Sequence, residues 1–329
     1  MLLELIDDKS QCFKCYKKRG SMVYAYIMML FVVIFYAGNI LTGRAINELP
    51  PFTIAFFRLA VAFIVTLPLG LRSAWRYRHK FLKYKKPFLI MTLTGITFFN
   101  TFIYSALQFT TSANVSVLEA VIPVATVVLS AILLKERLRN VQLLGVLISL
   151  LGAVWVVLDG NIFSLAAMNW NIGDAIMIGA IISWAVYSIL VNKYMHLFPQ
   201  FGALFVMSGI SAVVLLPIVM VEWFITGVPT ELKIPSNMLG LTYLGIFPSF
   251  IALIFYNRAV GKLGASQASI FLNFLPVVTM IGAYLWLDET ITLMKIAGAL
   301  VVISGVILTT KKRKEMTESN IRQAVNEID

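Results

Sequence analysis

One carboxylate stands alone in a long uncharged part of the chain. Glu119 is the only Asp, Glu, Lys or Arg between Pro87 and Leu134. If this segment crosses a membrane, an ionised side chain at that depth costs about 2.5–3.5 kcal/mol on insertion scales. Glu119 therefore needs either a compensating partner or a function that explains its position.

The residues around Glu119 form a polar face on a helix. The other residues of this segment are mostly Val, Leu, Ile and Ala, so the polar face should meet protein or water rather than lipid. Pro123 lacks an N–H, which leaves the carbonyl of Glu119 without its helical partner. The face consists of six residues separated by 4, 3, 4, 3 and 4 positions, the spacing of one helical face: Ser112, Ser116, Glu119, Pro123, Thr126 and Ser130.

Arg58 is the one candidate for an ionic partner of Glu119. Both residues lie about seven positions inside their apolar segments from the same side, which is about 10 Å at 1.5 Å per residue. Two interpretations stay open. In the first, Arg58 and Glu119 form a structural ion pair. In the second, Glu119 loads and releases a proton in each cycle, and Arg58 attracts an anionic group such as a substrate carboxylate.

The composition identifies the class of protein. Hydrophobic residues make up 59% of the 329 residues and charged residues only 13%, with a mean hydropathy of +0.86. Soluble domains average about 45–50% apolar and about 25% charged residues. The apolar runs are continuous rather than alternating, which favours helices of about 20 residues. We predict an all-α integral membrane protein with ten transmembrane helices, at residues 22–41, 52–71, 88–107, 113–134, 141–158, 172–190, 201–225, 238–257, 265–287 and 293–310.

The basic residues fix an expected orientation. With a cytoplasmic amino terminus, 23 Lys and Arg residues fall on the cytoplasmic side and 3 on the other, and Arg58 lies within a span. This asymmetry follows the positive-inside rule and predicts a multi-pass plasma-membrane protein with both termini cytoplasmic. The net charge of +11 then indicates contact with anionic lipid headgroups rather than with a nucleic acid.

The two halves of the chain resemble each other. Because each half holds five spans, the second copy must enter the membrane in the opposite orientation, and the matched loops agree: residues 135–139 are basic and residues 288–290 acidic. Inverted repeats are typical of secondary transporters, whose substrate sites lie between the copies. We predict a tail at 1–21, repeats at 22–158 and 172–310, and a second tail at 311–329. At an offset of 153 the matches include Ser116 with Ser269, Pro123 with Pro276, Glu136 with Glu289, Gly145 with Gly298 and Gly152 with Gly305.

These motifs resemble those of the EamA-type transporters of the drug/metabolite transporter superfamily. The resemblance runs from Met22 to Thr310 and implies ten helices and transport of small molecules, often efflux of amino acids or other metabolites, without ATP. Tyr36 stands where Trp is usual, whereas Trp184 keeps the pattern. The matching segments are Phe-Tyr-Ala-Gly-Asn at 35–39, Pro-Phe-Thr-Ile-Ala-Phe-Phe-Arg at 51–58, the Tyr-to-Ala segments 104–113 and 256–265, and the Pro-to-Glu segments 123–136 and 276–289.

Other polar residues inside the spans are candidates for the cavity, although Asn can also bond a neighbouring helix and Tyr or Trp can form the interfacial belt. Pro123 and Pro276 interrupt equivalent helices and point to the binding cavity, unless they only kink the helices for packing. Gly145, Gly152 and their counterparts are expected to let two helices approach closely. The cavity candidates are Asn39, Asn100, Tyr104, Trp184, Tyr187, Tyr256, Asn257 and Asn273.

The sequence lacks the residues that several other classes of membrane protein require. The histidines, His79 and His196, both fall in loops, and Cys12 and Cys15 have no further ligands nearby, so we expect neither an intramembrane enzyme nor a metal site. There is no P-loop for ATP and no filter or charged ring of a channel. We predict a secondary transporter without a cofactor, whose partners are a small-molecule substrate and membrane lipids but no nucleic acid. A lipid flippase of the same fold, a homodimer and Met22 as the first residue stay open.

Overall fold

The structure is a computed structural model of the chain. It describes residues 2–109, 115, 118–119, 121–133, 140–157, 160–161, 172–287, 292–294, 296–305 and 307–308, with the backbone alone for residues 2–21. Helices account for nearly all of these residues, and no strand occurs among them. The predicted all-helical class is therefore confirmed. The two loops whose charges favour inversion, 135–139 and 288–290, lie outside the described residues.

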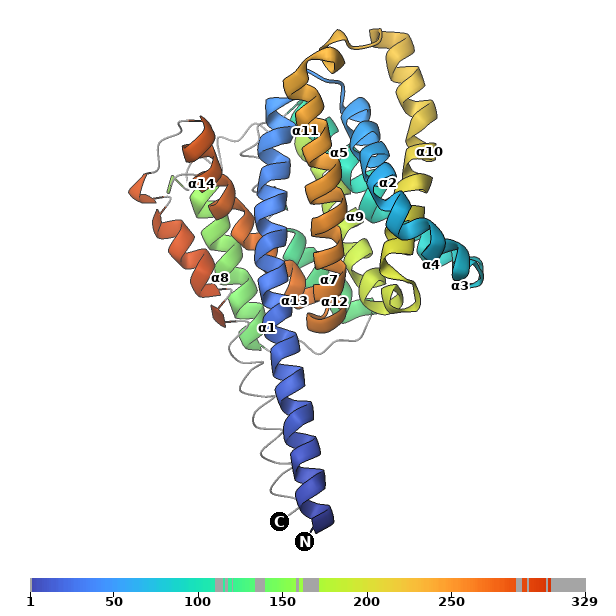
Figure 1. Ribbon diagram of the computed structural model, residues 1–329. Coiled ribbons are helices and arrows are strands. Elements are labelled where there is room, and N and C mark those ends of the chain that lie inside the picture. Colours follow the sequence, from blue (N-terminus) through green and yellow to red (C-terminus); the bar gives the residue numbers. More distant parts are fainter. Residues whose placement is uncertain are drawn as a thin grey trace.

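The first half of the chain contains a helix that extends well beyond the bundle at its amino-terminal end (Figure 1). The helices of this half are α1 (Leu2–Ala45), α2 (Pro51–Arg76), α3 (Arg78–Lys83), α4 (Lys85–Met91), the π-helix η1 (Thr92–Phe98), α5 (Phe99–Leu107), α7 (Ile122–Leu133) and α8 (Asn140–Val157).

The second half repeats the alternation of long helices and short irregular turns. Its helices are α9 (Ile172–Tyr194), η3 (Met195–Leu197), α10 (Gln200–Thr226), η4 (Thr230–Lys233), α11 (Pro235–Ile246), the π-helix η5 (Phe247–Ala252), α12 (Leu253–Leu263), α13 (Ala265–Ile270), the 3-10 helix η6 (Phe271–Phe274) and α14 (Leu275–Leu287). A further helical segment covers Ile296–Gly305.

Within the described residues, 7 helices are long and apolar enough to cross a membrane. They correspond to the predicted first, second, third, sixth, seventh, eighth and ninth spans. Shorter apolar helices at Leu143–Gly152 and Ile296–Gly305 occupy the predicted fifth and tenth spans, and α7 occupies part of the fourth. The membrane class is confirmed, and the count of ten stays a prediction.

Equivalent helices of the two halves share an unusual feature. The π-helix η1 lies between α4 and α5, and the π-helix η5 lies between α11 and α12, at positions related by about the same offset as the sequence repeat. A π-turn widens the helix locally and often occurs at functional sites. Both π-turns contribute residues to the pocket described below.

The helices around the pocket are paired across the two halves. Helix α2 packs along α10, α1 packs against α12 and α14, and α5 and α7 pack against α9. Figure 1 shows α8 and α14 on one side of α1, and α2 and α10 on the other. The arrangement brings segments of both halves to the middle of the bundle.

The predicted glycine surfaces are confirmed as a close contact between α8 and the segment Ile296–Gly305. A Cβ on Gly152 would lie 2.6 Å from the Val302 nitrogen, and one on Gly305 would lie 2.5 Å from the Ser149 nitrogen. Adding the repeat offset of 153 to Ser149 and Gly152 gives Val302 and Gly305. The two contacts are therefore equivalent in the two halves, as expected if a pseudo-two-fold axis relates the halves. Only glycine fits where the two backbones meet so closely.

We expect Gly152→Ala to destabilise the folded protein by about 1–3 kcal/mol, because the added methyl group meets backbone rather than a movable side chain. The melting temperature in detergent measures the effect. Gly261→Ala in α12 is the control, since a Cβ there has no atom within 4 Å. A Gly152→Ala protein as stable as the Gly261→Ala protein would contradict the close contact.

Each of the two prolines follows a local departure from α-helical geometry. Pro123 is the second residue of α7, after a turn at Val121, and Pro276 is the second residue of α14, directly after η6. Proline is tolerated in the first turn because no intrahelical N–H is needed there. Because Pro276 has no N–H, the carbonyl of Leu272 has no α-helical donor and accepts from the N–H of Leu275 in a 3-10 turn.

Candidate functional site

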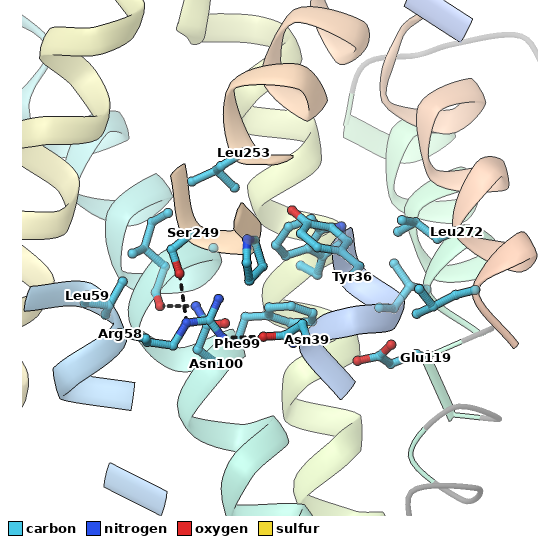
Figure 2. A pocket seen from close by; sticks show the side chains of 16 residues that line it. Tyr36, Asn39, Arg58, Leu59, Phe99, Asn100, Glu119, Ser249, Leu253 and Leu272 are labelled. Carbon is cyan, nitrogen blue, oxygen red and sulfur yellow. Dashed lines mark hydrogen bonds between the residues drawn. The ribbon is translucent and has the colours of Figure 1, made fainter. Parts of the chain in front are cut away.

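A pocket lies in the middle of the bundle, where segments of both halves meet (Figure 2). Its free volume is about 30 Å³, enough for one or two water molecules. A metabolite would therefore enter only if the surrounding helices moved apart. The pocket is lined by Tyr36, Asn39, Arg58, Leu59, Gly95, Ile96, Phe99, Asn100, Glu119, Ile122, Trp184, Pro248, Ser249, Leu253, Leu272 and Leu275.

Arg58 is held on one side of the pocket by neutral acceptors. Its side chain is 3% exposed. The Nε group donates to Ser249 Oγ at 2.9 Å, Nη1 donates to Asn39 Oδ1 at 2.9 Å, and Nη1 also donates to the Tyr104 hydroxyl. The Tyr104 hydroxyl in turn donates to Asn39 at 2.9 Å. These bonds fix the guanidinium but supply no negative charge.

Ser249 reaches Arg58 because of the π-turn η5. The Ser249 hydroxyl donates to the carbonyl of Leu244, five residues earlier, at 2.7 Å, and this leaves its lone pairs for Arg58 Nε. Asn100, next to η1, donates to the Ile96 carbonyl at 2.6 Å. Sequence reasoning missed Ser249, although Pro248 immediately before it, inside a span, was an available signal.

Arg58 and Glu119 do not form the ion pair that one interpretation of the sequence predicted. Both side chains line the pocket, and Figure 2 shows them at opposite ends of it, with Asn39 between them. Depth along the membrane normal was predicted to be similar, but two residues at one depth can still be separated laterally. The structural ion pair is therefore wrong for this arrangement.

Glu119 lies on a protein-facing surface, as its polar stripe predicted. Glu119 is 6% exposed, and Thr126 and Ser130 are fully buried. On the opposite surface of α7, Val128 and Ile132 are 50% and 67% exposed, which suits contact with lipid. Ser112 and Ser116 lie outside the described residues.

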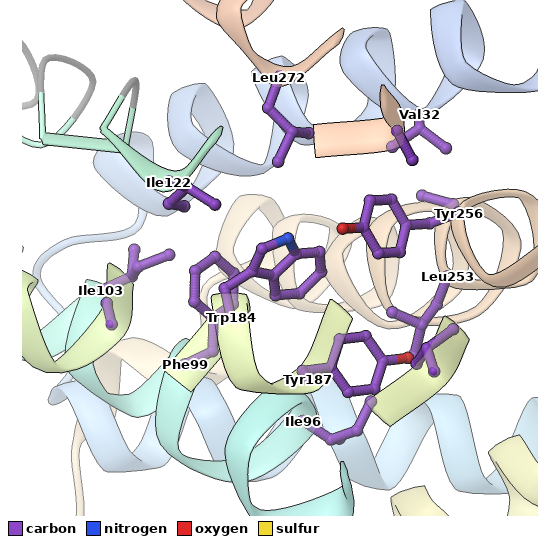
Figure 3. Close-up of a cluster of buried hydrophobic side chains, with 14 of the residues drawn as sticks. Val32, Ile96, Phe99, Ile103, Ile122, Trp184, Tyr187, Leu253, Tyr256 and Leu272 are labelled. Atoms are coloured by element: carbon purple, nitrogen blue, oxygen red, sulfur yellow. The ribbon is translucent and has the colours of Figure 1, made fainter. Parts of the chain in front are cut away.

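Aromatic rings close one wall of the pocket around Trp184 (Figure 3). The Trp184 ring centroid lies 4.3 Å from that of Phe99, 5.7 Å from Tyr36, 5.3 Å from Tyr187 and 5.0 Å from Tyr256. Within the part of the chain that the structure describes, the buried Tyr36 hydroxyl has no hydrogen-bond partner. Tyr36, the departure from the family pattern, thus presents an unused polar group at the site.

Apart from Asn273, the predicted binding residues fall into three groups. Tyr104 lies one hydrogen bond behind the pocket, on Arg58 and Asn39. Tyr187 donates to Asn257 at 2.7 Å and Tyr256 bonds Ser188 at 2.6 Å, so these three predicted residues support Trp184 from behind. The predicted residues that line the pocket directly are Asn39, Arg58, Asn100, Glu119 and Trp184. Ligand contact by any of them stays a prediction.

Asn273 does not line the pocket. Its Nδ2 donates to Ser149 Oγ at 2.6 Å, so it joins η6 to α8 instead of lining the pocket. Its position well inside a helix suggested the cavity, but the side chain faces the neighbouring helix. The alternative of a helix–helix hydrogen bond is the one that the structure supports.

Glu222 has a structural role that the sequence did not reveal. Its carboxylate accepts from the N–H groups of Phe52 and Thr53 at 3.2 and 2.9 Å and from Thr53 Oγ1 at 2.7 Å. Helix α2 begins after Pro50 with no side-chain cap of its own. A carboxylate from α10 therefore caps α2 and compensates its dipole.

We expect Glu222→Gln to lower the free energy of unfolding by about 1–2 kcal/mol, because the amide loses the charge that the helix terminus favours. The melting temperature of the purified protein measures this effect. Glu231→Gln, on the short helix η4 near by, serves as the control. Equal melting temperatures for the two variants would rule out the capping role.

In the described residues, no group of three or more His, Cys, Asp or Glu side chains is placed to hold a metal ion. The groups that the pocket offers are a cation, a carboxylate, amides and aromatic rings. Such a set is suited to a polar organic solute, which it can meet with charge, hydrogen bonds and ring surfaces.

Comparison with known proteins decides the family. The model of the EamA-like transporter family matches residues 23–158 and again residues 171–311. The chain belongs to the EamA-like transporter family. The resemblance inferred from the sequence motifs is thereby confirmed.

Relatives of this EamA transporter carry similar names. It is 26% identical over 285 residues to the uncharacterized transporter YyaM of Bacillus subtilis, covering 86% of this chain and 92% of that protein. A match to an uncharacterized transporter of Archaeoglobus fulgidus is 26% identical over 298 residues and covers 88% and 98% of the two chains.

Two further matches bear on export and on fold. A probable terminal-alkyne amino-acid exporter of Streptantibioticus cattleyicolor is 26% identical over 203 residues, 61% of this chain and 65% of that protein. A solved crystal structure aligns with a TM-score of 0.67 at 18% identity, covering 89% of this chain and 98% of its own. This last match shows a shared fold.

Proposed function

We propose that this EamA transporter is a secondary active exporter of a small amphipathic metabolite, an amino acid or a related compound, in the plasma membrane with both termini cytoplasmic. The proposal rests on Arg58, a buried cation at the centre of the bundle, whose hydrogen-bond partners among the described residues are all neutral. A buried charge without an opposite charge is costly. An anionic group of a bound solute would supply the missing charge.

In the proposed alternating-access mechanism, the pocket is the site that binds the solute. The pocket lies between the two halves, is lined by both π-turns, and has room for only one or two water molecules in this arrangement. In the proposed cycle the halves rock about the pocket and open it to one side of the membrane and then to the other. The similarity to a probable terminal-alkyne amino-acid exporter favours export as the direction of transport.

A thermal-shift screen of the purified protein against amino acids and metabolites is the first test, since a ligand that binds the folded state raises the melting temperature. Solutes that stabilise the protein are then tested for counterflow in proteoliposomes. Counterflow of a stabilising solute would support the proposal. Translocation of a labelled lipid without solute counterflow would contradict it and favour a lipid flippase of the same fold.

A further inference from the structure

The pocket has one charged group with unused hydrogen-bonding capacity at each end. Arg58 uses Nε and Nη1 for its neighbours, and among the described residues Nη2 has no hydrogen-bond partner. The Glu119 carboxylate likewise accepts no hydrogen bond from the described residues. Both side chains line the pocket and both are more than nine-tenths buried. Each is therefore positioned to bond a group that enters the pocket.

The two charges are kept apart by the surrounding structure. Arg58 is fixed to Asn39 and to Ser249 of η5, whereas Glu119 comes from the segment that leads into α7. In Figure 2, Asn39 lies between the two charged groups, and Phe99 and Tyr36 lie along the same path. A single compact ionic group cannot reach both ends without displacing these side chains.

The wall between the charges is aromatic and carries two polar groups, the Tyr36 hydroxyl and the Trp184 Nε1–H, neither of which has a hydrogen-bond partner among the described residues. Phe99, Tyr36 and Trp184 present ring surfaces there, which suit an apolar spacer or a flat ring. The buried Tyr36 hydroxyl lacks a partner among the described residues, and such a group is costly unless something bonds it.

We propose, resting on the proposed function for the identity of the pocket, that the site selects a dipolar solute whose anionic and cationic groups are separated by an apolar spacer, as in an ω-amino acid. Arg58 holds the anionic group through Nη2, and Glu119 holds the ammonium group. An α-amino acid carries both charges on one carbon and satisfies only one end. Charge-assisted hydrogen bonds at both ends then set the selectivity.

Isomers provide the test. ε-Aminocaproate and norleucine have the same composition and differ in the place of the amino group, and caproate and hexylamine each carry one of the two charges. The affinity of each compound is measured from the stabilisation of the purified protein as a function of ligand concentration. We expect ε-aminocaproate to bind about tenfold more tightly than each of the other three compounds.

Substitutions of the two charged residues test which residue binds which end of the solute. Glu119→Gln should remove the preference for ε-aminocaproate over caproate, and Arg58→Gln should remove its preference over hexylamine. Glu222→Gln is the matched control, because Glu222 caps α2 and does not line the pocket. It should lower the melting temperature and leave the order of affinities unchanged.

Norleucine binding as tightly as ε-aminocaproate to the wild-type protein would overturn the inference, as would a preference that survives Glu119→Gln. Absence of any stabilisation by ε-aminocaproate would also overturn it. If one of these results is obtained but some small solute still shows counterflow in proteoliposomes, the inference about selectivity fails and the proposed transporter function is retained. Failure of counterflow with every solute in the screen would remove the proposed function instead.

Discussion

Arg58→Gln should reduce the initial rate of solute counterflow by about a hundredfold or more. Glutamine removes the positive charge and at least one charge-assisted hydrogen bond to the solute, and about 2.7 kcal/mol of lost binding corresponds to a factor of a hundred. Arg58→Lys should retain part of the activity. Lysine keeps the charge but cannot bond Asn39, Tyr104 and Ser249 in the fixed geometry of a guanidinium.

The matched control for Arg58→Gln is Arg72→Gln, on the same helix α2 but exposed to solvent. Its counterflow rate should stay within about twofold of the wild-type rate, because exposed charges contribute little. Size-exclusion profiles and melting temperatures show whether both variants are folded. A folded Arg58→Gln protein with wild-type counterflow would remove Arg58 from the site.

Glu119→Gln should abolish proton-driven uptake into inverted membrane vesicles while counterflow at saturating solute continues. A carboxylate can load and release a proton, whereas the amide of the same shape cannot. Counterflow exchanges one solute molecule for another and needs no net proton movement. The measurement is uptake with an imposed pH gradient, compared with counterflow in the same preparation.

Glu222→Gln is again the control for this substitution, since Glu222 binds the terminus of α2. Proton-driven uptake by that variant should persist at a temperature well below its melting point. Proton coupling at the wild-type level in Glu119→Gln would end the assignment of Glu119 as the proton carrier. The alternative would then be a carrier without proton coupling or one that couples through another group.

Much of the bundle could be predicted because the pattern in the sequence has a direct physical cause. Uninterrupted apolar runs become helices since lipid leaves no other partner for the backbone. Glycines at matched positions became a close helix contact at Gly152 and Gly305. The polar face of Glu119, Thr126 and Ser130 became a buried face, because a polar side chain that faces lipid has no hydrogen-bond partner there.

The details of the site required the three-dimensional structure. Counting residues gives depth in the membrane but not lateral position, so Arg58 and Glu119 seemed adjacent and lie at opposite ends of the pocket. Asn273 seemed central but bonds Ser149 on a neighbouring helix. The role of Ser249 depends on a π-turn, which shifts the helix face by part of a turn. Such a shift leaves no regular spacing in the sequence.

Contacts between residues of distant helices could not be predicted from the sequence either. Glu222 caps α2 from 169 and 170 positions away, and nothing local to either segment announces that contact. In the sequence, Tyr36 differs from the family pattern, but nothing there indicates that its hydroxyl would lack a partner. Its unpartnered hydroxyl emerged from the packing around Trp184.

The orientation of the two halves is the central claim, and site-directed labelling tests it most directly. Single cysteines are placed within residues 135–139 or within residues 288–290 of a chain whose 2 native cysteines are replaced. A membrane-impermeant thiol reagent is then applied to right-side-out and inverted vesicles. We expect the first position to be labelled from the cytoplasmic side and the second from the outside. Labelling of both positions from the same side would contradict two oppositely oriented halves around a shared pocket.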